Sequence, residues 1–86
     1  MKFARTLNFV KKYKKLPLPI KKQIEKQILF LEKDFFHPSL NTKKKSGFPD
    51  WWEFRVSKGY RMTGKKIGDE LILHTVGIHD EGLGKM

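Results

Sequence analysis

The chain has 86 residues, no cysteine, and a formal net charge of +10 from 19 Lys and Arg against 9 Asp and Glu. The lack of cysteine excludes a disulfide framework and a thiolate metal site, and no apolar run approaches the roughly 18 residues of a membrane helix. The positive charge gathers in residues 1–50, which hold 13 basic and 4 acidic side chains. This asymmetry favours a nucleic acid, a ribosome or an acidic protein as partner, although lysines that only solvate helices would also produce it. We expect residues 1–86 to form a single soluble, cytoplasmic domain.

The N-terminal half predicts one short strand and two helices. Residues 2–5 suit the strand, and Thr6 or Asn8 is the expected N-cap of the first helix. Prolines at positions 17 and 19 then break the chain, and a proline fits the first turn of a second helix. We expect this second helix to end at His37-Pro38, because the residue before a proline avoids the α region. Apolar residues spaced by three or four positions predict that it is amphipathic, namely Ile20, Ile24, Ile28, Leu31 and Phe35.

The C-terminal half predicts a loop followed by three strands. Residues 37–50 are rich in the Pro, Ser, Asn and Gly that mark loops, and strands follow at roughly 51–57, 59–66 and 70–78. The order β-α-α-β-β-β is typical of an α+β fold. We expect two N-terminal helices packed on one face of a small, mainly antiparallel four-stranded sheet, with the other face free for a ligand.

The first two of these strands predict a hairpin that carries two opposed arginines. If Ser57-Lys58-Gly59 is a three-residue turn, Val56 faces Tyr60 and Arg55 faces Arg61. Like charges directly opposite in a sheet are destabilising, so the pair predicts an anion between them, such as a phosphate. Glu53 offers an alternative, because an internal ion pair from the same face would neutralise an arginine without any ligand.

The third strand predicts where the histidines lie. If its isoleucines and its valine join Tyr60 and Met62 on the core face, strand alternation places His79 on the face of the arginines. The same alternation places His74 in the core or in the layer facing the helices, where a structural role is expected.

Cleavage of RNA by its own 2′-hydroxyl group requires a base, an acid and cations for the phosphorane, but no metal and no cofactor. His79 is the first candidate for the acid or base, because an unperturbed histidine pKa of about 6.5 lies near working pH. Asp80 would orient its ring, or the two would form a structural pair at a strand end. Arg55 and Arg61 suit the phosphate, because a guanidinium binds two oxygens and stays charged. His37, which precedes a proline, is expected to have a local structural role rather than to approach RNA.

Further cations and one aromatic residue are candidates for nucleic-acid binding. The loop cluster Lys43-Lys44-Lys45 would contact an RNA backbone or simply be solvated. By strand alternation, Lys65 shares the face of the arginine pair. Trp51 points to the same face, where it would stack on a base or cover Leu71 and Leu73. We favour the packing role, because those leucines would otherwise be exposed.

The chain resembles the RelE/ParE superfamily of toxin–antitoxin toxins over nearly its whole length. The resemblance implies a compact fold of two N-terminal helices against a small, mainly antiparallel sheet, and a cognate antitoxin that wraps the toxin. It is carried by segments that occur in a fixed order: Phe9–Pro17 before a long second helix, His37–Leu40, Trp52–Ser57 with Gly59–Arg61, and Val76–Asp80.

The resemblance also implies an activity. Toxins of the RelE type cut mRNA in the ribosomal decoding site, without metal, through the 2′-hydroxyl group. Arg61 matches the arginine of that group that contacts the scissile phosphate, His79 matches the acid–base candidate of YafQ-like members, and the loop lysines correspond loosely. Leu83 stands where many relatives carry an aromatic residue, so either His79 works with cations alone or activity is weak or lost.

We therefore predict a ribosome-dependent mRNA endonuclease toxin, an mRNA interferase, of a type II toxin–antitoxin system. Its expected partners are an antitoxin, the ribosome and mRNA. Two alternatives follow from the same residues. One is a ParE-like toxin that inhibits DNA gyrase by binding it. The other is a decayed toxin that retains only antitoxin or RNA affinity, which Glu53 and Leu83 favour.

Overall fold

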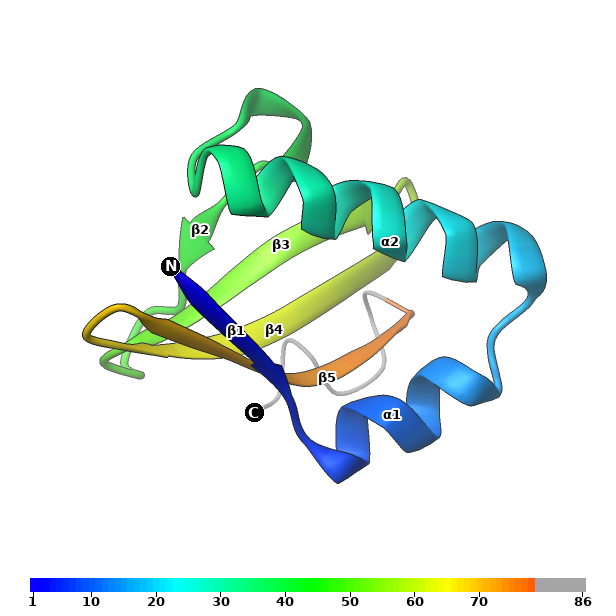
Figure 1. Cartoon of the computed structure of the whole chain (residues 1–86), viewed down its shortest axis with the longest axis horizontal. Coiled ribbons are helices and arrows are strands. Elements are labelled where there is room, and N and C mark those ends of the chain that lie inside the picture. The colour runs from blue at the N-terminus through cyan, green and yellow to red at the C-terminus, as the bar shows by residue number, and fades with distance from the viewer. Residues whose placement is uncertain (79–86) are drawn as a thin grey trace.

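The computed structural model describes residues 1–78. In that range the chain forms a mixed five-stranded sheet, two α-helices and one short 3₁₀ helix (Figure 1). The elements in chain order are β1 (Lys2–Arg5), α1 (Leu7–Lys14), α2 (Leu18–Lys33), η1 (Pro38–Leu40), β2 (Lys43–Lys44), β3 (Trp51–Ser57), β4 (Tyr60–Ile67) and β5 (Glu70–Ile78).

The strands follow the order β1-β5-β4-β3-β2 across the sheet. The pairs β2–β3, β3–β4 and β4–β5 are antiparallel, whereas β1 lies parallel to β5, with Phe3 opposite Leu71. The predicted α+β class is confirmed. The sheet has one strand more than predicted, because β2 is a two-residue edge strand inside the segment expected to be a loop. The sequence does not predict this strand, because two adjacent lysines show no alternation of apolar and polar residues.

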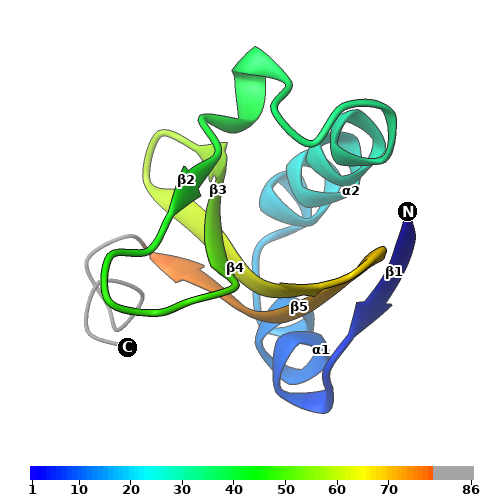
Figure 2. The same cartoon turned by 90° about the vertical axis from the view of Figure 1, so that its left-hand side faces the viewer.

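Both helices cover the same face of the curved sheet (Figure 2). Their buried side chains join those of β3, β4 and β5 in a single core, as expected from the amphipathic pattern of α2. Neither helix is long and apolar enough to span a membrane, within the part of the chain that the structure describes. The core consists of Phe9, Ile24, Ile28, Leu31, Leu40, Phe54, Val56, Met62, Leu71, Leu73 and Val76.

The helix ends follow local capping chemistry. Thr6 is the N-cap of α1, and its hydroxyl accepts a hydrogen bond from the backbone N–H of Phe9 at 3.1 Å. Helix α2 ends at Lys33, earlier than the predicted stop at His37. The reason is Asp34, which adopts an extended conformation and accepts a hydrogen bond from the N–H of Phe36 through its carboxylate.

The β3–β4 hairpin confirms one predicted pair and corrects another. Arg55 lies directly opposite Arg61, as predicted. The turn has two residues rather than three, because Ser57 pairs with Tyr60 and the register shifts between Arg55 and Ser57. Val56 is therefore the extra residue of a β-bulge and does not face Tyr60.

A second bulge in β5 overturns the predicted position of His74. Thr63 pairs with Thr75 but Gly64 pairs with Leu73, so His74 has no partner on β4. Leu73 consequently points into the core and His74 points away from it, which is the reverse of the prediction. The carbonyl of His74 accepts hydrogen bonds from two side chains near the start of α1, the Thr6 hydroxyl at 3.1 Å and the Asn8 amide at 3.0 Å.

Arg5 and Glu25 join β1 to α2 on the helix side of the sheet. The guanidinium makes two hydrogen bonds to the carboxylate, at 2.9 and 3.1 Å, and it also lies 5.6 Å from the ring centroids of Phe9 and Tyr13. The hydrogen bond from Arg5 lowers the pKa of Glu25, against an opposing effect of burial.

This pair makes part of the stability dependent on acid. A depressed carboxyl pKa stabilises the folded state above the ordinary pKa of 4.5, and this contribution is lost as pH falls through the lower folded value. We expect Glu25→Gln to lower the free energy of unfolding at pH 7 by at most about 1 kcal/mol, since the pair is partly exposed. Urea titrations from pH 7 to pH 3 should show this difference shrinking below pH 4.5. Glu32→Gln, at an exposed position of α2, is the control, and an equal effect there would contradict the assignment.

Candidate nucleic-acid interface

The sheet face that lies opposite the helices carries most of the predicted site residues, and we call it the open face. Strand register arranges its side chains in three rows that cross the sheet. The first row contains Arg55, Arg61 and Gly77. The second row contains Lys43, Glu53, Thr63 and Thr75, and the third contains Trp51, Lys65 and Ile72, with the unpaired His74 between the second and third rows.

The two arginines of the first row differ in how firmly they are held. Nη1 of Arg61 donates to the carbonyl oxygens of Ser57 at 2.8 Å and Tyr60 at 3.0 Å, and its side chain is half-buried. Arg55 is exposed and its guanidinium makes no hydrogen bond or ion pair with residues 1–78. The pair thus combines one cation that is held by backbone carbonyls with one that is exposed to solvent.

Glu53 lies beside Arg61 and not beside Arg55. Its carboxylate is 3.9 Å from Nε of Arg61, a long ion pair between side chains that are each 16% exposed. The internal neutralisation considered from the sequence therefore applies in part to Arg61. Arg55 keeps its charge open to solvent.

Gln27 fixes the backbone beneath the arginine pair. It is a polar residue of α2 that is only 2% exposed, and its amide nitrogen donates to the carbonyls of Arg55 at 2.8 Å and Ser39 at 3.0 Å. Sequence reasoning missed it, because one glutamine among the apolar positions of a helix does not reveal which strand it will meet.

Trp51 and His74 pack against each other at the other end of the open face. Their ring centroids lie 4.7 Å apart with an interplanar angle of 57°. Burial, followed by the charge of Lys65, lowers the pKa of His74, so its imidazole is neutral at neutral pH. The predicted direction of Trp51 is confirmed, but it does not cover Leu71 and Leu73, which are buried on the helix side.

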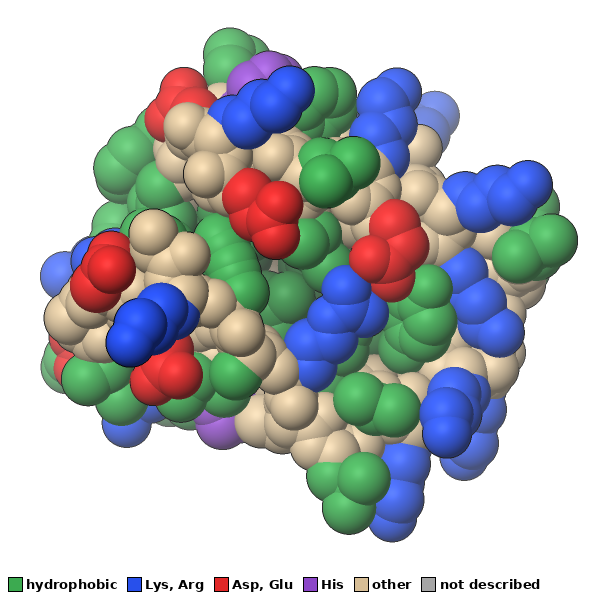
Figure 3. Space-filling model, viewed as in Figure 1, with side chains coloured by type: hydrophobic (Ala, Val, Ile, Leu, Met, Phe, Trp, Pro, Cys, Tyr) green, Lys and Arg blue, Asp and Glu red, His purple; other side chains and the backbone are tan. Residues whose placement is uncertain are grey.

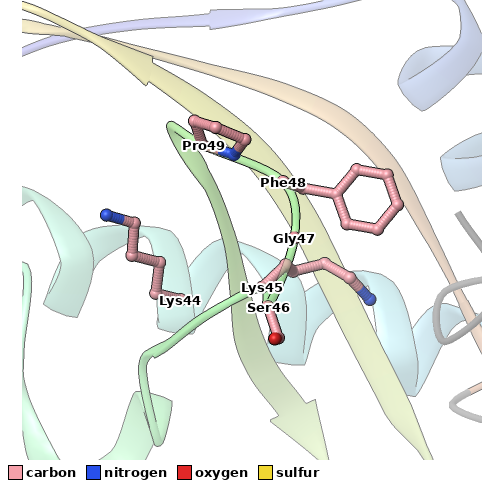
Figure 4. A pocket seen from close by; sticks show the side chains of 6 residues that line it. All are labelled: Lys44, Lys45, Ser46, Gly47, Phe48 and Pro49. Carbon is pink, nitrogen blue, oxygen red and sulfur yellow. The ribbon is translucent and has the colours of Figure 1, made fainter.

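The three loop lysines are separated by the structure. Lys43 lies opposite Glu53 and joins the open face, whereas Lys44 lies opposite Trp52, which points toward the helices. Lys45 begins a tight loop, in which its N–H donates to the carbonyl of Trp51 at 3.0 Å. Figure 4 shows Lys44 and Lys45 extending to different sides of a hollow that is lined by residues 44–49.

A second basic surface covers the helices. Figure 3 shows Lys and Arg side chains gathered over α1 and the adjoining part of α2. The acidic Glu25 is engaged by Arg5 and does not offset this charge. The lysines of α1, of its C-cap and of the N-terminal part of α2 are Lys11, Lys12, Lys14, Lys15, Lys21, Lys22 and Lys26.

Two predicted residues, His79 and Asp80, lie outside the described residues, as does Leu83. His37 has local contacts: its ring stacks on Phe30 with centroids 4.2 Å apart, and its Nδ1 accepts from the N–H of Ser39 at 3.2 Å. Among residues 1–78, no three His, Asp or Glu side chains are grouped so that they could hold a metal ion.

Solved structures of bacterial and archaeal toxins share this architecture. No family model and no curated protein matches the sequence. The chain is similar to the RelB–RelE antitoxin–toxin complex from Methanococcus jannaschii, with a TM-score of 0.75 and 25% identity, over 87% of this chain and 88% of that one. It is similar to the intact Escherichia coli RelBE complex, with a TM-score of 0.74 and 20% identity over 93% and 98%. It is also similar to E. coli YafQ, with a TM-score of 0.76 and 12% identity over 96% and 98%.

These similarities confirm the predicted RelE-like fold. The RelE toxin complex that is 25% identical also bears out the resemblance to RelE-type toxins drawn from the sequence segments. The likeness extends over nearly all of each structure compared, so it covers the open face and both helices together.

Proposed function

We propose that this chain is the toxin of a type II toxin–antitoxin pair and acts as a ribosome-dependent mRNA endonuclease in the cytoplasm. The observation that carries the proposal is the placement of Arg55 opposite Arg61 on a sheet face that the helices leave open. Two guanidinium groups at neighbouring positions repel each other unless an anion lies between them. The similarity to RelE and YafQ structures supports a toxin.

The arginine pair would stabilise the transition state of RNA cleavage. The 2′-oxygen attacks the adjacent phosphorus, the bond from phosphorus to the 5′-oxygen breaks, and a 2′,3′-cyclic phosphate forms. One proton leaves the 2′-hydroxyl and another reaches the departing 5′-oxygen. Arg61, held by backbone carbonyls, and Arg55 would bind the phosphorane oxygens. His79 would act as the general acid or base with Asp80 orienting it.

The basic surface over α1 and α2 would hold ribosomal RNA, and Lys43 would add a phosphate contact next to the open face. Phosphate contacts of this kind fix the register of a protein on a nucleic acid without reading its sequence. The antitoxin of this chain would be an acidic protein, because negative charge complements the net charge of +10 and steers the two chains together. RelB–RelE complexes are the precedent for such a pair.

The proposal is tested by incubating the purified protein with mRNA-programmed ribosomes and, separately, with the same mRNA free. Mapping of 5′ ends by primer extension should show cleavage on ribosomes only, and its loss in His79→Ala. Cleavage of free mRNA at the same rate would remove the ribosome dependence. Intact mRNA in both reactions, from a protein that still arrests growth, would favour a ParE-like action on gyrase.

A decayed toxin is the second candidate, and the Glu53 carboxylate beside Arg61 favours it. A carboxylate near the phosphate site repels an anionic substrate and weakens cleavage. Strong expression without growth arrest would select this alternative. Glu53→Gln tests the role of this carboxylate: it should strengthen RNA binding if the carboxylate only opposes the phosphate, and it should abolish cleavage by an active toxin if the carboxylate takes part in proton transfer.

A further inference from the structure

We infer that Trp51, His74 and Lys65 form a nucleobase-binding element for single-stranded RNA at the end of the open face away from the arginine pair. The inference rests on the proposed function, because it identifies where a nucleotide near the cleaved phosphate is held. Three strands contribute to it: Trp51 from β3, Lys65 from β4 directly opposite, and His74 from the bulge of β5.

The rings are placed on this face by the fold rather than by burial of apolar surface. Trp51 cannot be covering Leu71 or Leu73, since both are almost fully buried on the helix side of the sheet. Its ring instead contacts the imidazole of His74 at 4.7 Å, and it remains half-buried on a face where Ile72 is the one other apolar side chain in its row. A large flat side chain in such surroundings suits a planar ligand.

The separation from the arginine pair suits a short RNA segment. Trp51 and Lys65 each lie four residues along their strand from Arg55 and Arg61, which corresponds to about 13 Å at about 3.3 Å per residue. Threonines occupy much of the row between them, and the hydroxyl oxygen of Thr63 is buried without a hydrogen-bond partner among the residues described. The two ends of the face are therefore within reach of one short RNA segment.

The chemistry of the three groups is that of a stacking platform. Bases stack favourably on aromatic side chains and with little sequence preference, because every base has a flat π-face. The neutral imidazole of His74 offers a flat ring with one donor and one acceptor nitrogen. Lys65 supplies the charge that attracts the backbone beside the stacked base.

The test uses an RNA hexamer with 2′-O-methyl sugars, which binds without being cleaved because the attacking hydroxyl is blocked. Versions with one abasic position are compared with the intact hexamer by fluorescence anisotropy, and inorganic polyphosphate serves as a polyanion without bases. We expect the wild-type protein to bind the intact hexamer about tenfold more tightly than one of the abasic versions. Trp51→Ala and Trp51→Leu should both remove that difference and leave polyphosphate binding within twofold.

Two further variants sharpen the assignment. Phe36→Ala removes an exposed aromatic ring that packs toward the helix side, and it should leave the preference for the intact hexamer unchanged. His74→Phe should retain the preference, because it keeps a flat ring against Trp51. Loss of the preference in His74→Phe would show that the imidazole nitrogens act instead of the ring and would overturn the stacking role.

The inference is also overturned if every abasic hexamer binds the wild-type protein as tightly as the intact one, or if the Trp51 variants lose hexamer and polyphosphate affinity equally. Circular dichroism melting of each variant verifies that it is folded, and Trp51→Leu keeps an apolar side chain where Trp51→Ala fails. Because the hexamer cannot be cut, this result is independent of the ribosome assay. Base-dependent binding by a protein that does not cleave mRNA would support the nucleobase-binding element and exclude the proposed endonuclease activity.

Discussion

Replacing Arg61 by alanine should reduce mRNA cleavage on ribosomes by about 100- to 1,000-fold, the loss that follows removal of one group that stabilises a transition-state anion. The change removes the guanidinium that the backbone of the hairpin holds in place, and Arg55 alone cannot fix a phosphate between two strands. The measurement is the rate of primer-extension product formation, with growth arrest on induced expression as the cellular counterpart.

Two variants control for charge and for folding. Lys58→Ala removes one positive charge from the exposed turn of the same hairpin and should change the rate less than threefold. Arg61→Lys keeps the charge but loses the planar fork, and we expect an intermediate rate. The two hydrogen bonds lost with Arg61 should cost about 1–2 kcal/mol of stability, so the variant remains folded. A folded Arg61→Ala protein that still arrests growth fully would exclude the proposed role.

Replacing Gln27 by leucine should lower the free energy of unfolding by about 2–4 kcal/mol, because two carbonyl groups lose a buried donor. The volume of the side chain is nearly conserved from Gln to Leu, so a loss of packing contributes little to the effect. Urea titration followed by tryptophan fluorescence measures the effect, since Trp51 and Trp52 both lie on β3. The variant should also lose cleavage beyond its loss of stability, because the Gln27 amide fixes the carbonyl of Arg55.

Gln23→Leu is the matched control for this prediction. Gln23 lies one turn earlier on α2, is half-buried, and makes no hydrogen bond among the contacts of residues 1–78. Its substitution should change the free energy of unfolding by at most about 0.5 kcal/mol. If both glutamine variants were equally stable, the two hydrogen bonds of Gln27 would carry no net stabilisation and its positioning role would have to be abandoned.

The sequence predicted the elements whose signals are local. The periodicity of α2 and the alternation around Arg55 and Arg61 depend on neighbours within a few positions, so the helix and the arginine pair were identified correctly. The cap of α1 was predicted as Thr6 or Asn8, and it is Thr6. The end of α2 was placed too late, because the proline after His37 gave a stronger signal than the ordinary aspartate at position 34.

The part that could not be predicted depends on contacts between distant segments. The position of His74 is decided by the bulge opposite Gly64, where an added Cβ would lie 2.9 Å from the carbonyl oxygen of Ile72. Glycine at that position lets β4 and the bulged strand approach closely. The one sequence signal was the spacing of Leu71, Leu73 and Val76, since buried residues separated by two and then three positions indicate an extra residue in a strand.

The parallel pairing of β1 with β5 has a consequence for synthesis on the ribosome. β1 is translated before the other elements described, but its hydrogen-bonding partner is the last of these strands, which also provides Leu71, Leu73 and Val76 to the core. A nascent chain that already contains the hairpin of Arg55 and Arg61 therefore has no complete hydrophobic core on which to fold. We expect the proposed toxin to stay unfolded and inactive until β5 has emerged. It is therefore not yet a folded enzyme while the ribosome is still making its earlier strands.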